Sequence, residues 1–172
     1  FVKPVAFRIG ANKRGGTSRE ARITNNLFYD CGEAAIKFPT RDNDAQGNLY
    51  VKMPGGYLRV LYPAPENCLD LQAWQEFYGF DREGQEGFFT IRVDTEKLTL
   101  EMEKADHVPG GRHHGTGRQE YTADPEKVLP VKASMETADD FYGTAPKERR
   151  VPGPFAVLEA GRVYDIDPRK HN

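Results

Sequence analysis

The chain has 172 residues, of which 38% are hydrophobic, and its formal net charge at pH 7 is -2. This length normally forms one domain, and the 17 glycines and 12 prolines indicate many turns. The nearly balanced charge excludes a global attraction to nucleic acid or to a membrane surface. No apolar stretch of the sequence is long enough to span a bilayer. Any electrostatic recognition must therefore come from local patches.

The first strand-like segment, residues 5–9, begins almost at the first residue, as if the chain were entered within a structure. The sequence starts without an initiator Met and without a charged leader followed by an apolar run. We therefore expect a processed chain or a part of a longer one.

A strand-and-turn unit recurs at an offset of 22 residues. The aligned pairs are Asn26 with Asn48, Leu27 with Leu49, Phe28 with Tyr50, Ile36 with Leu58, Lys37 with Arg59 and Phe38 with Val60. Such units bury a continuous core only when they stack, and this period fits the coils of a β-solenoid. The Asn that opens each copy tolerates the left-handed backbone of a tight bend. Its amide is also expected to hydrogen-bond to the next copy.

Further elements follow the two aligned copies. Residues 6–9 and 90–93 repeat the strand pattern. A short helix is predicted over 69–78, because apolar residues recur there at helical spacing, and Gly79 ends it. Alternating apolar residues predict a hairpin over 88–102.

These elements define three regions. Residues 1–102 form the coils with the short helix and the hairpin, 103–139 a long polar loop without apolar periodicity, and 140–172 a C-terminal capping or flanking segment. Within the loop, His113 and His114 lack further convergent ligands, so a polar loop is favoured over a metal site. We therefore predict no metal site, and nothing in the sequence requires a cofactor.

The two cysteines, Cys31 and Cys68, have no CxxC spacing, which excludes that type of metal or redox motif. A disulfide between them is the alternative to free thiols. Cys31 lies in an apolar stretch, and we expect it to be a buried thiol.

Several segments resemble right-handed parallel β-helix proteins of bacterial carbohydrate metabolism, which include glycoside hydrolases and polysaccharide lyases. The segments are residues 25–29, 71–75 with 79–81, 140–143 and 152–153. The resemblance runs loosely over residues 20–155. It implies an all-β, right-handed parallel β-helix of which this chain forms the C-terminal coils. It also implies an extracellular or periplasmic protein several times longer, with its active groove mostly on preceding coils. No catalytic motif of that family stands in this sequence.

Four strand segments read apolar–basic–apolar, with Arg8, Lys37, Arg59 and Arg92 at their centres. Because neighbouring strand residues point to opposite faces, these cations are expected to face outward, about 4.8 Å apart from coil to coil. Like charges that face each other are unfavourable. The row therefore predicts a binding surface for an acidic polysaccharide. Ordinary, locally paired surface charge is the favoured alternative.

Acidic and aromatic residues supply the other candidates. Asp42 and Asp44 share one face of an extended loop, and Asp81 with Glu83 follows the helix. Paired carboxylates carry out glycoside hydrolysis, so Asp42 and Asp44 are the catalytic candidates, against the alternative of ordinary loop acids. Tyr57 and Tyr62 are candidates for stacking on sugar rings, whereas Trp74 is expected to pack the helix onto the coils.

The sequence thus predicts part of a secreted carbohydrate-active enzyme, a glycoside hydrolase or polysaccharide lyase acting on polysaccharide. The alternative is a non-catalytic glycan-binding or structural β-helix segment of a larger protein. An enzyme would converge a carboxylate pair, or a base and a cation, in one cleft, whereas a structural segment would show dispersed, locally paired charges. The expected partners are a polysaccharide or oligosaccharide, and the rest of a longer chain or another subunit that covers the open coil.

Overall fold

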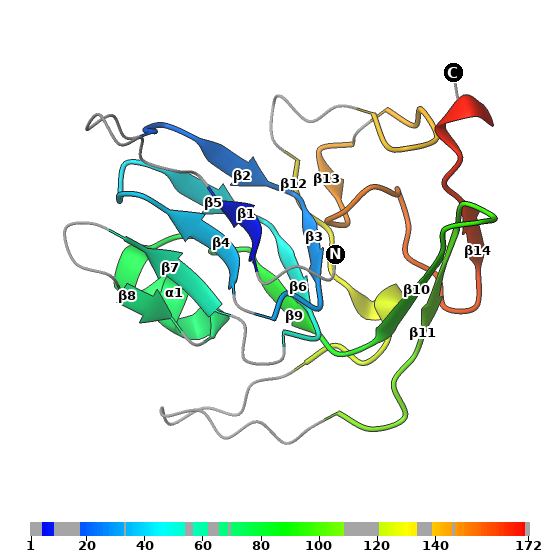
Figure 1. The fold of residues 1–172 in the computed structure, drawn as a ribbon, viewed down its shortest axis with the longest axis horizontal. Helices are drawn as coiled ribbons and strands as arrows, with labels where there is room; N and C mark the ends of the chain where they lie inside the picture. The colour runs from blue at the N-terminus through cyan, green and yellow to red at the C-terminus, as the bar shows by residue number, and fades with distance from the viewer. Residues whose placement is uncertain are drawn as a thin grey trace.

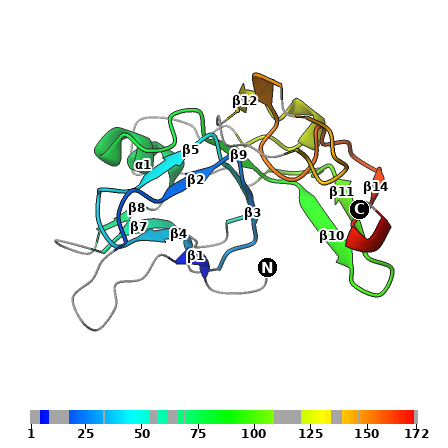
Figure 2. The same ribbon diagram turned by 90° about the horizontal axis from the view of Figure 1, so that it is seen from above.

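The computed structural model describes residues 5–8, 18–32, 34–53, 57–61, 66–68, 70–108, 121–133, 139–145 and 147–170. Within these ranges the chain forms one α-helix, two short 3-10 helices and a series of short strands (Figures 1 and 2). None of these helices is both long enough and apolar enough to cross a membrane.

The strands of the repeated region pair in parallel and belong to three separate sheets. The first contains β1 (Val5–Arg8), β4 (Ala34–Phe38), β7 (Tyr57–Val60) and β8 (Glu66–Cys68), the second β2 (Arg22–Thr24) and β5 (Asp44–Gln46), and the third β3 (Leu27–Tyr29), β6 (Leu49–Val51) and β9 (Gln85–Gly87). The three groups surround a shared interior, as Figure 2 shows. The register joins Leu27 to Leu49 and Lys37 to Arg59, so the 22-residue alignment is confirmed.

The expected fold class, an all-β right-handed parallel β-helix, is nevertheless wrong. The structure is mixed and strand-rich, with several small separate sheets, and no sheet in its described part is closed or runs on as a solenoid. The parallel succession in the first sheet ends because β8 turns back antiparallel to β7. The chain then enters the helix instead of adding another parallel strand beside β7.

The remaining sheets are antiparallel. One contains β10 (Thr90–Asp94), β11 (Thr99–Glu103) and β14 (Val163–Asp165), and the other β12 (Val131–Lys132) and β13 (Arg149–Arg150). The hairpin predicted over 88–102 is present as β10 and β11. Both antiparallel sheets are formed by the later part of the chain and lie beside the parallel strands (Figure 1).

The single described α-helix, α1 (Leu71–Tyr78), lies within the predicted span of 69–78. The Asp70 side chain caps its first turn by accepting a hydrogen bond from the Ala73 N–H at 2.7 Å. Gly79 ends the helix in the left-handed conformation, with φ of 74°, which glycine adopts without a steric penalty. Trp74 is fully buried and stacks on Phe38, with ring centroids 5.9 Å apart. This contact packs the helix onto β4, as expected for Trp74.

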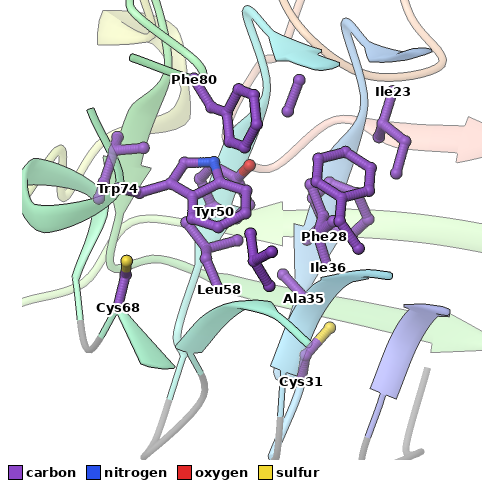
Figure 3. Close-up of a cluster of buried hydrophobic side chains, with 14 residues drawn as sticks. Ile23, Phe28, Cys31, Ala35, Ile36, Tyr50, Leu58, Cys68, Trp74 and Phe80 are labelled. Carbon is purple, nitrogen blue, oxygen red and sulfur yellow. The ribbon is translucent and has the colours of Figure 1, made fainter. Parts of the chain in front are cut away.

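Two hydrophobic cores lie on opposite sides of β6. Tyr50 enters the first core with Phe28, Ile36, Leu58 and Trp74 (Figure 3), and its neighbours on β6 enter the second. Successive residues of a strand point to opposite faces, so a strand between two cores is buried at every position. Both cysteines lie in the first core as free thiols, which confirms the burial of Cys31.

A buried chain of amides links successive copies of the repeat. The Asn26 backbone N–H and its Nδ2 donate to Oδ1 of Asn48, at 3.0 and 3.2 Å. Asn48, which is 0% exposed, donates from its backbone N–H and from Nδ2 to the two carboxylate oxygens of Asp81, each at 2.9 Å. The expected hydrogen bonding between copies is confirmed. The left-handed backbone, however, lies one residue earlier, at Asn25 (φ 58°) and Gly47 (φ 62°).

Replacement of Asn48 by alanine tests this chain of amides. Asn48→Ala keeps the backbone N–H bond to Asp81 but removes the Nδ2 donor to this buried carboxylate and the Oδ1 acceptor for Asn26. We therefore expect a loss of about 2 kcal/mol in the free energy of unfolding. Urea denaturation followed by circular dichroism measures it. The control is Asn26→Ala at the exposed end of the chain of amides, for which a loss below about 1 kcal/mol is expected. Equal losses in the two variants would contradict the role assigned to Asn48.

Candidate functional site

A cavity of about 690 Å³ lies between α1, β9 and residues 121–129. Its polar lining residues are Gln72, Gln75, Gln85, Glu86, Thr122, Asp124 and Lys127, and Tyr121 adds an aromatic ring. Gln72 and Gln75 come from one face of α1, since residues three apart on a helix lie side by side. Glu86 is the central residue of β9 and pairs in register with Tyr50.

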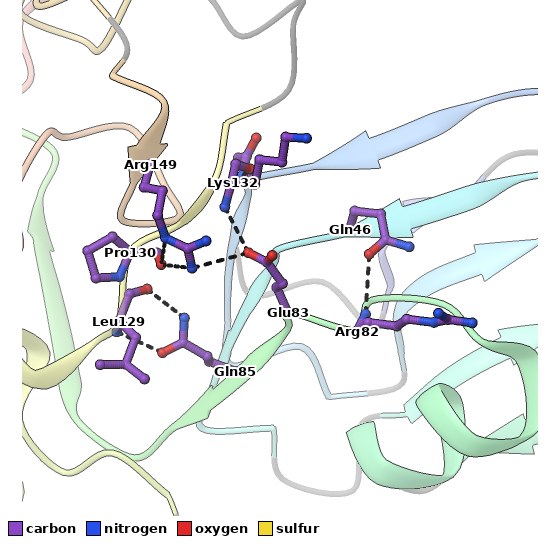
Figure 4. A network of polar contacts seen from close by, with 9 residues as sticks. Gln46, Arg82, Glu83, Gln85, Leu129, Pro130, Lys132 and Arg149 are labelled. Atoms are coloured by element: carbon purple, nitrogen blue, oxygen red, sulfur yellow. Dashed lines mark hydrogen bonds and ion pairs between the residues drawn. The ribbon is translucent and has the colours of Figure 1, made fainter.

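The wall formed by residues 121–129 is attached to β9 through its backbone. Thr122 N–H donates to the Glu86 carbonyl at 3.0 Å, and Phe88 N–H donates to the Thr122 carbonyl at 2.9 Å. The Gln85 carboxamide adds two bonds to Leu129: its Nε2 donates to the carbonyl at 2.7 Å and its Oε1 accepts from the N–H at 2.8 Å (Figure 4). The two walls of the cavity therefore hold a defined separation.

Asp124 fixes the part of this wall that leads into the 3-10 helix η1 (Pro125–Lys127). Its carboxylate accepts from the Glu126 N–H at 3.0 Å at the start of this helix. Lys104 Nζ lies 2.8 Å from the other carboxylate oxygen. The hydrogen bond from Lys104 is the main cause that lowers the pKa of Asp124. This cavity-lining carboxylate is therefore ionised and already paired.

Behind the cavity lies Asp81, which is 0% exposed. Besides the two bonds from Asn48, its carboxylate accepts a hydrogen bond from the Tyr50 hydroxyl, and its backbone carbonyl accepts one from Gln75 Nε2 at 2.7 Å. A Cβ on Gly84, which lines the cavity, would lie 2.8 Å from the Asp81 carboxyl carbon. Only glycine fits there, so Asp81 shapes this wall of the cavity.

The predicted basic residues occupy two different places. Arg8, Lys37 and Arg59 are aligned in register on β1, β4 and β7, whereas Arg92 lies on β10 in another sheet and pairs with Glu103 at 2.9 Å. Lys37 is only 8% exposed and Arg59 is half-buried. The side chain of Arg8 lies outside the described part of the chain. The four cations therefore form no single outward row, and their role in binding stays a prediction.

The predicted acids do not line the cavity. Asp42 is exposed and lies 3.6 Å from Arg19 Nε, and half-buried Asp44 accepts from Gln46 Nε2 at 3.3 Å. Of the second acidic pair, Asp81 is the buried carboxylate and Glu83 is exposed, where it accepts from the Lys132 N–H at 2.8 Å (Figure 4).

The aromatic and histidine candidates cannot be placed in the same way. Tyr62, the side chain of Tyr57 and the pair His113 and His114 lie outside the described residues. Among the residues that are described, no three His, Cys, Asp or Glu side chains are grouped so that they could hold a metal ion.

The cavity residues were missed because the third copy of the repeat is hidden in the sequence. Gln85, Glu86 and Gly87 continue the register of β6, but β8 and α1 separate them from the second copy, which ends with β7. The sequence signal that could have indicated this third strand is the pair of aligned repeats that precedes β8 and α1. It predicts a further strand without giving its position.

Comparisons with known proteins add no relative. The chain matches no protein-family model, no curated protein and no solved structure. The resemblance to carbohydrate-active proteins therefore stays a prediction, and the function has to be argued from the site.

Replacement of Asp81 tests the ionisation of this buried carboxyl group, because that ionisation makes the free energy of unfolding depend on pH. Burial raises the pKa of Asp81 above its ordinary value, although hydrogen bonds from Tyr50 and Asn48 oppose this effect. The folded state therefore retains this proton to a higher pH than the unfolded chain, whose Asp has a pKa of about 3.9. The stability from this proton is fully present below that value and is lost as pH rises through the folded pKa.

We therefore expect wild type to lose stability relative to Asp81→Asn as pH rises from about 4 to 7. Unfolding free energies of both proteins across this range measure the difference. At every pH the variant also lacks one acceptor for the Tyr50 and Asn48 donors, which adds a constant offset. A difference that does not change with pH would show that Asp81 has no raised pKa.

Proposed function

We propose that this protein binds an oligosaccharide or a segment of a polysaccharide in the cavity between α1, β9 and residues 121–129. The observation that carries the proposal is the combination of size and lining. A volume of about 690 Å³ falls within the range of about 300–1,000 Å³ that is usual for small-ligand sites. The lining combines three carboxamides, two carboxylates, a lysine ammonium group, a hydroxyl and a tyrosine ring.

This lining suits a sugar for chemical reasons. Each sugar hydroxyl both donates and accepts hydrogen bonds, and a carboxamide side chain offers two donors and an acceptor. Gln75 and Gln85 are already held by Asp81 and Leu129 and retain capacity for a further bond. The ring of Tyr121 adds an apolar surface with a polar end. Side chains held in place before binding lose little conformational entropy on binding.

The distribution of charge favours binding without catalysis. The cavity carboxylate of Asp124 is engaged by Lys104. In the described part of the chain other charges form dispersed local pairs, such as Arg19 with Asp42 and Arg92 with Glu103. This pattern was expected of a non-catalytic, structural segment and not of an enzyme, so we propose binding without catalysis. An extracellular or periplasmic location belongs to the same proposal.

Tyr121→Ala tests the proposal because the ring lines the cavity at a half-buried position. The probes are short oligosaccharides of glucose, xylose and galacturonic acid, titrated into the protein by calorimetry. For an oligosaccharide that binds wild type, we expect about tenfold weaker binding, equivalent to about 1.4 kcal/mol, because one stacking contact is lost.

Phe77→Ala is the matched control. Phe77 is an aromatic residue on α1, the helix that forms one wall of the cavity, but it is 60% exposed and does not line the cavity. Its replacement should leave the affinity unchanged. Failure of wild type to bind any of the three oligosaccharides, or the same loss in both variants, would refute the proposed site.

A further inference from the structure

A second, smaller cavity lies in the later part of the chain. It has a volume of about 140 Å³ and is lined by Asp140, Thr144, Ala145, Lys147, Arg149, Arg150, Ala156 and Val157. At about 30 Å³ for each water molecule, this volume corresponds to roughly four or five waters. It is therefore large enough for one small ion or one substituent of a larger ligand.

The walls of this cavity are joined by Asp140. Its Oδ1 accepts from the Tyr142 and Thr144 N–H groups at 2.9 and 2.7 Å, and its Oδ2 accepts from the Ala156 N–H at 2.9 Å. Burial alone would raise the pKa of Asp140, but the hydrogen bonds from Thr144, Ala156 and Tyr142 outweigh burial and lower it. The carboxylate is thus ionised, and both of its oxygens are occupied by donors from the walls.

Three cations share the same lining. Arg150 is buried and donates from a terminal nitrogen to the Gly153 carbonyl at 3.0 Å. Arg149 is exposed, donates to the Pro130 carbonyl at 2.6 Å and lies 3.5 Å from Glu83 (Figure 4). Lys147 is exposed and has no ion-pair partner among the described residues.

The lining therefore carries an excess of positive charge. Three cations line the cavity against one carboxylate, Asp140, whose oxygens accept from backbone donors. Glu83, which shares Arg149, does not line the cavity. Like charges held close together repel, and a bound anion offsets this repulsion. The arginine guanidinium groups and the lysine ammonium group are the side chains that proteins use to bind oxyanions.

From this combination of volume, charge and fixed walls, we propose that the cavity lined by Lys147, Arg149 and Arg150 binds a small oxyanion. The bound group is a sulfate, phosphate or carboxylate, either as a free ion or as the anionic substituent of a saccharide. This site is separate from the larger cavity and does not depend on saccharide binding there.

Calorimetric titration of the folded protein with sodium sulfate and with sodium phosphate at low ionic strength tests the proposal. We expect saturable binding with one site, and we expect Lys147→Gln to weaken it about three- to tenfold through the loss of one charge-assisted contact. Because Lys147 is exposed, this variant keeps the fold. Val157→Asp, which places a carboxylate at the exposed rim of the cavity, should weaken binding further.

Lys97→Gln is the matched control, because Lys97 is an exposed lysine paired with Asp94 on the turn between β10 and β11. The affinity of the Lys97→Gln variant for sulfate and phosphate should equal that of wild type. Titration with galacturonic acid and with a sulfated monosaccharide distinguishes a free ion from a saccharide substituent, according to which ligand binds more tightly. Absence of saturable binding of all these ligands, or equal affinity in wild type, Lys147→Gln and Val157→Asp, would overturn the proposal.

Discussion

The hydrogen bonds to the buried carboxylate of Asp81 are the interaction on which the rest of the structure depends. This carboxylate is fully buried, and a buried charge is tolerated only where hydrogen bonds replace its water. Asn48 and Tyr50 supply these bonds from the turn before β6 and from β6 itself. The backbone of Asp81 binds Ala45 on β5 and Gln75 on α1. One residue thus connects the repeat, the helix and the wall of the larger cavity.

The position of β6 between two cores explains how two kinds of sheet form one molecule. Its Tyr50 packs against the parallel strands and α1, whereas Leu49 and Val51 pack against Phe89, Met102 and Phe155. The apolar residues of the later chain are buried against the second face of β6. No further coil of parallel strands is needed to cover them. The stability of the later chain therefore depends on the same strand that carries the repeat.

The two proposed sites differ in physical character for a structural reason. The larger cavity lies between secondary structure elements, and its lining combines three carboxamides with the charged groups Glu86, Lys127 and Asp124, of which Asp124 is paired with Lys104. The smaller cavity lies between β13 and the neighbouring turns, where Asp140 uses its oxygens to hold the walls and Lys147, Arg149 and Arg150 share the lining. The exposed Arg92, by contrast, is paired with Glu103 on the neighbouring strand.

The sequence by itself determined the features that depend on local spacing. The pairing of Leu27 with Leu49 followed from the repeat, and the C-terminal end of α1 followed from its apolar spacing and Gly79. Only the tertiary structure decided the antiparallel return of β8 and the hydrogen bond between Asn48 and Asp81, which lie 33 residues apart. Periodicity states which face of an element is buried. It does not state which distant residue will be there, so neither the two cavities nor the fold class followed from it.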